Sequence, residues 1–270
     1  MNIRIYTLIF VSIFYCKLSA QDYKDFFYSG VAKCEKKDFH GAIKDFNKSI
    51  NLNSEIATTY CVRGYTKYLL QDYYGSIQDC NKAIEIDTSY EDAYYKRGIS
   101  KYELKDFKGA IKDFNKVIQL NPDDVIAYFN RANSKHNLMD YSSAINDYNK
   151  VIQLNPNNST AYHKRGISKI ALEDYYGAIQ DFDKSIALNS NESEVYYNRA
   201  AIKMKLKDYI SAIDDYNKVI LLNPSNSEAY YNRGLSKYKI NKKDACLDWS
   251  KAGELGEIKA YDVIKEFCNK

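Results

Sequence analysis

The sequence predicts an all-α protein in which one helical hairpin is repeated along the chain. Pro122 and Pro156 stand 34 residues apart, and Pro224 follows Pro156 after 68 residues, twice that spacing. Small residues return at two fixed places in each period, and aromatic residues return at two others. A fixed period of this length is typical of stacked helical units, in which each unit contacts its neighbours.

Residues 91–124 show what the first helix of one copy contains. Tyr94, Gly98 and Tyr102 follow helical spacing and form an apolar stripe along that helix. Gly98 has no side chain, so another part of the chain can approach its backbone closely. This pattern predicts a helix that packs against other helices.

The second helix of the same copy follows after Lys105 and Asp106. Ala110, Phe114 and Val117 recur at steps of three and four residues and form its inner face. The Asn-Pro pair that follows ends the helix, because proline lacks a backbone donor and disfavours helix in the residue before it. Neither helix can bury its apolar face alone, so each pair requires a neighbour.

Seven copies follow from the same frame. They span residues 23–56, 57–90, 91–124, 125–158, 159–192, 193–226 and 227–256. The eighth position is always small: Gly30, Gly64, Gly98, Ala132, Gly166, Ala200 and Gly234. So is the twentieth: Ala42, Ser76, Ala110, Ala144, Ala178 and Ala212. We expect helices to touch at these small residues.

Two further positions are expected to form the core. The seventeenth is aromatic throughout: Phe39, Tyr73, Phe107, Tyr141, Tyr175 and Tyr209. The twenty-fourth is Phe46, Cys80, Phe114, Tyr148, Phe182 and Tyr216.

This combination of period, small residues, core aromatics and closing proline resembles the tetratricopeptide repeat family over residues 23 to about 255. The resemblance implies a right-handed superhelical solenoid of antiparallel helix pairs, in which the first helix of each pair lines a concave groove. It also implies a non-enzymatic binding scaffold for protein partners, although members of one fold serve many different partners.

The resemblance also implies which side chains line the groove, at defined positions of each first helix. These are Phe27, Tyr65, Tyr68, Tyr95, Tyr102, Phe129, Asn133, His136, His163, Tyr197, Met204, Tyr231 and Tyr238. A largely aromatic inner surface suits a peptide or an extended protein segment, because rings offer contact area at low entropy cost. The alternatives are that the tyrosines stack on a glycan, or that about half of them merely pack between neighbouring helices.

Two ladders of opposite charge run through the copies. Arginine stands at the seventh position as Arg63, Arg97, Arg131, Arg165, Arg199 and Arg233, and aspartate at the twenty-third as Asp45, Asp79, Asp113, Asp147, Asp181 and Asp215. We expect each arginine to pair with an aspartate of its own or the adjacent copy, because a carboxylate is the bidentate partner that arginine prefers. The alternative is that these rows bind an acidic ligand.

The last copy departs from the pattern and ends in a cap. One residue is missing between Ile240 and Ala245, and residues 257–270 form an amphipathic segment that reads as a capping helix. If residues 244–255 and 258–268 form a helical hairpin, Cys246 and Cys268 lie near the open ends of its two arms. We therefore predict a Cys246–Cys268 disulfide, with two buried thiols as the alternative.

Residues 1–20 differ from the repeats and read as a signal peptide. Arg4 precedes an apolar run of twelve residues, and Ser19 and Ala20 form a small-residue cleavage region. An uncleaved anchor or a first helix of the fold is the alternative. Cleavage near Ala20 would leave the chain secreted or in the periplasm or cell envelope, and would lower the formal charge from +4 to +2.

No catalytic constellation rises above the repeat pattern. The sequence has no CxxC pair and no Cys/His cluster with zinc spacing, so neither a metal nor a cofactor is expected. Charges of both signs alternate along the helices, which gives no reason to expect a nucleic-acid partner.

Overall fold

The computed structural model describes residues 22–241 and 244–268, and over these residues its regular structure is helical, with no strand. The chain divides into two compact units, Met1–Leu138 and Met139–Lys270. The helical segment 22–35 is followed by α2 (Phe39–Leu52), α3 (Ala57–Leu69), α4 (Tyr73–Ile86), α5 (Glu91–Glu103), α6 (Phe107–Leu120) and α7 (Val125–Asn137) in the first unit. The second unit holds α8 (Tyr141–Leu154), α9 (Ser159–Ala171), α10 (Tyr175–Leu188), α11 (Ser193–Lys205), α12 (Tyr209–Leu222), α13 (Ser227–Lys239), α14 (Ala245–Glu254) and α15 (Lys259–Phe267).

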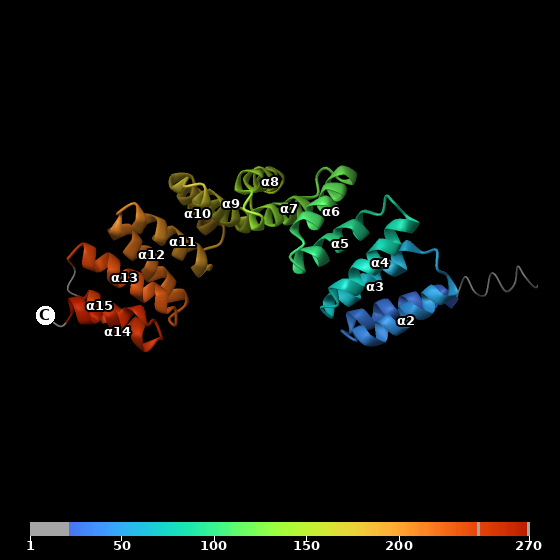
Figure 1. Cartoon of the computed structure of the whole chain (residues 1–270), viewed down its shortest axis with the longest axis horizontal. Coiled ribbons are helices and arrows are strands. Elements are labelled where there is room, and N and C mark those ends of the chain that lie inside the picture. The colour runs from blue at the N-terminus through green and yellow to red at the C-terminus, as the bar shows by residue number, and fades with distance from the viewer. Residues whose placement is uncertain (1–21, 242–243, 269–270) are drawn as a thin grey trace, which may run out of the picture. The chain divides into compact units, whose positions relative to one another are not determined.

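Helices in the N-terminal unit pack in the order of the sequence (Figure 1). Each helix from α2 to α7 contacts the next, and α3 and α5 also contact each other, as do α5 and α7. The first helices of successive copies therefore lie side by side. The C-terminal unit follows the same rule from α8 to α15, with α11 against α13.

The predicted all-α stack of helix pairs is therefore confirmed within each unit. The predicted signal peptide at residues 1–20 lies outside the described residues.

A left-handed residue followed by an aspartate cap separates the two helices in each of the first six copies, whereas Asp244 in the last copy makes no such cap bond. Lys105 has a φ of 61°, and the Asp106 side chain then accepts a hydrogen bond of 2.9 Å from the Gly109 backbone N–H at the start of α6. The same left-handed position holds Lys37, Gln71, Lys105, Met139, Glu173, Lys207 and Asn241. None of these is glycine, so the Asp cap that follows is the more informative sequence signal for this turn.

The twenty-fourth position forms the core of each copy, as predicted. Phe46, Cys80, Phe114, Tyr148, Phe182 and Tyr216 are all 0–1% exposed. Trp249 takes this place in the last copy, where it is fully buried and its indole N–H donates to the Tyr231 carbonyl at 3.2 Å.

The expectation that the seventeenth position is also core is wrong. All six of its rings are only half-buried. Tyr73 lies 5.5 Å from the ring of Tyr68, and Phe107 lies 5.3 Å from the ring of Tyr102. Tyr73 and Phe107 are each the first residue of a second helix, so they lie at the turn end of the hairpin, where they contact a first-helix tyrosine instead of filling the space between the two helices.

The arginine ladder pairs internally. Arg97 makes a bidentate contact of 3.0 and 2.5 Å with Asp113 of its own copy, and donates at 2.7 Å to Asn81 of the preceding copy. Lys101 also reaches Asp113, at 2.8 Å. The same own-copy pairing joins Arg63 to Asp79, Arg165 to Asp181, and Arg199 to Asp215.

One rung of the ladder was missed from the sequence. Arg233 pairs with Asp248, 15 residues on instead of 16, because one residue is missing from the last copy. The side chains of the arginines in these five pairs are 15–18% exposed, so they hold the helices of a copy together rather than offering a free surface to an acidic ligand.

The C-terminal cap is a hairpin of α14 and α15. Its open ends are joined by a disulfide between Cys246 and Cys268, with an S–S distance of 2.11 Å, which is the pairing expected from the sequence. Ala245, Ala252 and Ala260 are buried against Trp249 in the same cluster.

Candidate functional site

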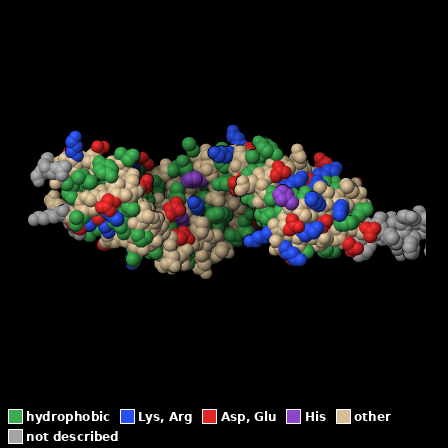
Figure 2. All heavy atoms as spheres, turned by 90° about the horizontal axis from the view of Figure 1, so that it is seen from below, with side chains coloured by type: hydrophobic (Ala, Val, Ile, Leu, Met, Phe, Trp, Pro, Cys, Tyr) green, Lys and Arg blue, Asp and Glu red, His purple; other side chains and the backbone are tan. Residues whose placement is uncertain are grey.

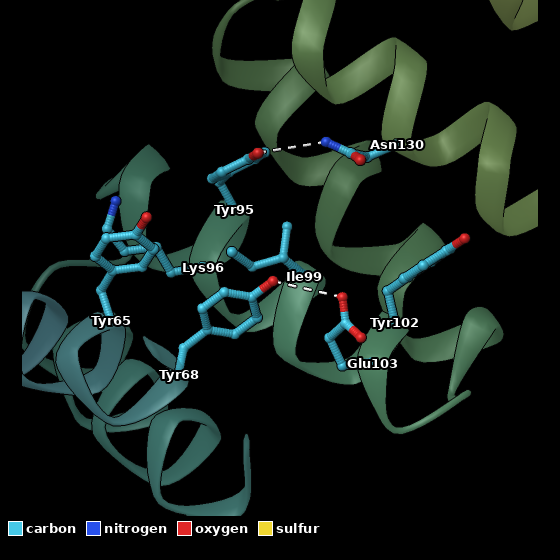
Figure 3. Close-up of a pocket in the computed structure, with 8 residues that line it drawn as sticks. All are labelled: Tyr65, Tyr68, Tyr95, Lys96, Ile99, Tyr102, Glu103 and Asn130. Carbon is cyan, nitrogen blue, oxygen red and sulfur yellow. Dashed lines mark hydrogen bonds between the residues drawn. The ribbon is translucent and has the colours of Figure 1, made fainter. Parts of the chain in front are cut away.

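A pocket of about 430 Å³ opens on the N-terminal unit between α3, α5 and α7 (Figure 3). Its walls come from the first helices of three successive copies, which the hairpin stack brings side by side. The lining residues are Tyr65, Tyr68, Tyr95, Lys96, Ile99, Tyr102, Glu103 and Asn130. Four rings therefore face one space together with two opposite charges and an amide.

One end of the pocket holds a stacked pair of tyrosines and a lysine. The rings of Tyr65 and Tyr68 are nearly parallel, with centroids 5.9 Å apart, and Tyr65 is 37% exposed. The Lys96 ammonium lies 4.8 Å from the centre of the Tyr65 ring and 3.4 Å from a carboxylate oxygen of Asp92. The charge of Lys96 is thus already balanced within the chain.

The hydroxyl groups of two other tyrosines are held by asparagines of the next copy. Asn130 donates to the Tyr95 hydroxyl at 3.3 Å, and Asn137 donates to the Tyr102 hydroxyl at 3.1 Å. Because each hydroxyl oxygen accepts in this bond, its own proton stays available to donate.

Tyr68 also reaches Glu103, which lies on the far side of it from Tyr65 (Figure 3). The Tyr68 hydroxyl donates to a carboxylate oxygen of Glu103 over a long distance of 3.4 Å, and Figure 3 shows Glu103 lying between Tyr68 and Tyr102. Burial, reinforced by the nearby Glu103 charge, raises the pKa of Tyr68 to about 12. Tyr68 therefore keeps its proton and acts as a donor at neutral pH.

These contacts share one register that the sequence analysis missed. A residue at the fifth or twelfth position bonds a residue 35 positions later, at the sixth or thirteenth position of the next copy. The pairs are Tyr68–Glu103, Tyr95–Asn130, Tyr102–Asn137, His163–Asn198 and Tyr197–Asn232. The recurrence of asparagine at the sixth position is the signal that could have placed Asn130 in the site.

The predicted groove residues divide between the two units. Tyr65, Tyr68, Tyr95 and Tyr102 meet in the pocket. Others lie on the same unit but do not line it, and are half-buried: Phe27, Phe129, Asn133 and His136. The remaining ones belong to the C-terminal unit: His163, Tyr197, Met204, Tyr231 and Tyr238.

His163 does not line a groove, contrary to the expectation. Its side chain is buried, with 3% exposed, and its ring packs 5.8 Å from the ring of Phe182. Its Nε2 lies 3.0 Å from the Asn198 amide nitrogen, which makes Nε2 the acceptor of the neutral imidazole. Tyr238 is 41% exposed, but its ring packs 4.7 Å from Phe267 of the cap.

Over the described residues, His, Cys, Asp and Glu side chains form no group that could hold a metal ion. None of the helices described here combines the length and apolar character that a bilayer crossing needs. On the face shown in Figure 2, basic and acidic side chains are intermingled, and no broad area carries one sign of charge.

Comparison with known proteins decides the family. Models of the tetratricopeptide repeat match residues 57–90, 91–124, 125–158 and 193–226, which together make up half of the chain. The chain belongs to the tetratricopeptide repeat family. The four matched segments have the same bounds as four of the copies read from the sequence.

Solved tetratricopeptide repeat structures share the fold. The C-terminal part of a repeat-containing protein from Cytophaga hutchinsonii is similar with a TM-score of 0.73 and 18% identity, over 87% of this chain and 98% of that one. A tetratricopeptide repeat protein from Parabacteroides merdae is similar with a TM-score of 0.67 and 21% identity, over 91% and 97%. YrrB, described as having an unusual peptide-binding site, is similar with a TM-score of 0.61 and 20% identity, over 69% and 97%. The search of curated proteins found no match.

Proposed function

We propose that this tetratricopeptide repeat protein is an exported, non-enzymatic scaffold that binds a peptide or an extended protein segment in the pocket of its N-terminal unit. The observation that carries the proposal is the meeting of four tyrosines from two adjacent helices around one space of about 430 Å³. Rigid rings with polar tips bind a partner at low entropy cost.

The polar groups of the pocket support a peptide as the guest. Tyr95 and Tyr102 keep hydroxyl protons for the carbonyl groups of an extended backbone, while the Asn130 amide lies beside them. The fold likeness to YrrB adds a relative for which a peptide-binding site is described. A glycan is the competing guest, because sugar rings also stack on tyrosine.

Export is part of the proposal and is supported by two features. Residues 1–20 have the composition of a signal peptide, and a disulfide joins Cys246 to Cys268 in the cap. Disulfides persist in oxidising compartments. Mass spectrometry of the mature N-terminus, after expression of the full chain in a secretion-competent host, should find a first residue at or next to Gln21. A chain that still begins with Met1 would remove export from the proposal.

Selection from a phage-displayed library of random peptides tests the binding function. Tyr65→Ala is the probe variant, because this ring lines the pocket and is 37% exposed, so its loss should leave the fold intact. Tyr74→Ala is the matched control, because Tyr74 is 72% exposed on α4 and does not line the pocket.

The expected result is a set of peptides that bind the wild type and Tyr74→Ala but bind Tyr65→Ala at least about fivefold more weakly. Peptides that bind all three proteins equally would place binding elsewhere. A library that yields no binder, beside a glycan array that yields a Tyr65-dependent one, would replace the peptide by a sugar.

A further inference from the structure

The pocket offers a carboxylate that the chain itself leaves without a cation. Glu103 is exposed, and within the described residues it makes no ion pair and one hydrogen bond, the long one of 3.4 Å from Tyr68. The basic residues of α5 pair with other carboxylates: Lys96 with Asp92, and Arg97 and Lys101 with Asp113. The carboxylate of Glu103 is therefore a charge in the pocket that no cation of the described residues neutralises.

Elsewhere in the chain, the group that binds a tyrosine ring and a carboxylate at the same time is an arginine guanidinium. Six arginines of the ladder each lie over a tyrosine three residues earlier, with the guanidinium carbon 5.2–5.6 Å from the ring centre. Arg97, for example, lies over Tyr94 while its N–H groups make the bidentate contact with Asp113. A guanidinium suits this combination because its flat face stacks on a ring while its edge donates to a carboxylate.

Tyr68 and Glu103 repeat that combination without an arginine of the chain. Their ring and carboxylate come from adjacent first helices, α3 and α5, and face the same pocket (Figure 3). The pairing occurs once in the repeats, because the other links between a twelfth and a thirteenth position join different residue types, such as Tyr102 with Asn137. The feature thus belongs to this pocket and not to the repeat pattern.

From this geometry we infer that the pocket recognises an arginine side chain of the bound segment, stacked on the Tyr68 or Tyr102 ring and paired with Glu103. The inference rests on the proposed peptide-binding function and names the residue type that the partner must carry. Lys96 lies at the other end of the pocket, where it pairs with Asp92, so Glu103 is the carboxylate of the pocket that can receive the guanidinium.

A pair of small probes tests the inference directly on the full chain. N-acetylarginine N-methylamide carries the guanidinium, and the citrulline analogue has the same shape without the charge. Binding is followed by NMR of the protein carrying ¹³C-labelled tyrosine rings, with Tyr→Phe variants to assign Tyr68 and Tyr102. The arginine probe should shift both ring signals and bind about fivefold more tightly than the citrulline probe.

Two glutamate variants supply the internal control. Glu103→Gln should lower binding of the arginine probe to the level of citrulline. Glu35→Gln should leave it unchanged, because Glu35 holds the same register position in the first copy and does not line the pocket. Equal binding of the two probes, or an arginine response that survives Glu103→Gln, would overturn the inference.

Failure of this inference can be told apart from failure of the proposed function. Selected peptides that depend on Tyr65 but show no arginine enrichment, together with equal binding of the two probes, would leave peptide binding intact and remove the arginine. If the selection yields no peptide at all, the proposed peptide-binding function is refuted, and so is the arginine-bearing partner inferred from it.

Discussion

Gly98 and Phe114 approach so closely that a β-carbon on Gly98 would lie 2.8 Å from the Cε1 atom of the ring. Phe114 is fully buried between the two helices of its copy, so it has no room to move away. This contact sets how near α5 can lie to α6. The same pairing joins Gly30 to Phe46, Gly166 to Phe182 and Gly234 to Trp249.

Gly98→Ala should destabilise the protein by about 1–3 kcal/mol, because the added methyl overpacks the hairpin. Gly64→Ala is the matched control, because there the nearest atoms lie 3.1 Å away and the opposing side chain is the smaller Cys80. That variant should stay within about 1 kcal/mol of the wild type, helped by the better helix propensity of alanine. Urea unfolding followed by circular dichroism gives both values, and equal losses would refute the packing argument.

Asp113→Ala should be among the most damaging single changes. Asp113 is 2% exposed and receives Arg97 and Lys101, so its removal leaves two cations in a partly buried place without their carboxylate. Breaking such a pair costs about 3–5 kcal/mol. Glu85→Ala, which breaks the exposed pair with Lys82, should cost less than about 1 kcal/mol in the same unfolding experiment. A comparable loss in both variants would contradict the structural role of the ladder.

Folding stability should fall below about pH 6.5 because of His163. Burial lowers the pKa of His163 below its usual 6.5. The unfolded chain therefore binds the proton more readily, and stability rises with pH between the folded and unfolded pKa values. The stability that the buried neutral His163 contributes is fully present above pH 6.5. It declines by up to about 1.4 kcal/mol per pH unit as the pH drops from 6.5 toward the folded pKa, and it does not change further below that pKa.

His163→Phe isolates this contribution. Phe27 and Phe129 stand at the same position in other copies, so the site accommodates a phenyl ring. The variant should lose the part of the pH slope that lies just below pH 6.5, measured by urea unfolding between about pH 5 and pH 8. An unchanged slope would assign the pH dependence to other groups.

The cap disulfide should stabilise the C-terminal unit by about 3 kcal/mol, the value that loop closure predicts for a separation of 22 residues. Replacing Cys246 and Cys268 together by serine should produce that loss, and hydrogen exchange should rise first in α14 and α15. The double variant should no longer respond to reductant, since Cys34, Cys61 and Cys80 are free. A reductant-induced loss of equal size in the double variant would exclude the cap as its source.

Most of the fold could be read from local patterns. The 34-residue period, the small residues at the eighth position and the buried rings at the twenty-fourth predicted the hairpins correctly, because packing within one hairpin depends on residues close in sequence. Even the cap disulfide followed from the expected hairpin of α14 and α15.

The candidate site was only half predictable. Tyr65, Tyr68, Tyr95 and Tyr102 were placed in a groove by their repeat positions, but Asn130 and Lys96 were not.

By itself, then, the sequence determined the repeated unit, its register and the aromatic character of the first helices. Only the tertiary structure decided which of those aromatic and histidine side chains face solvent. His163 is buried and Tyr65 is exposed although both lie on first helices, and Glu103 meets Tyr68 across 35 residues. The physical reason is that exposure depends on what the neighbouring copy places against a side chain, and small differences between copies change that contact without changing the period.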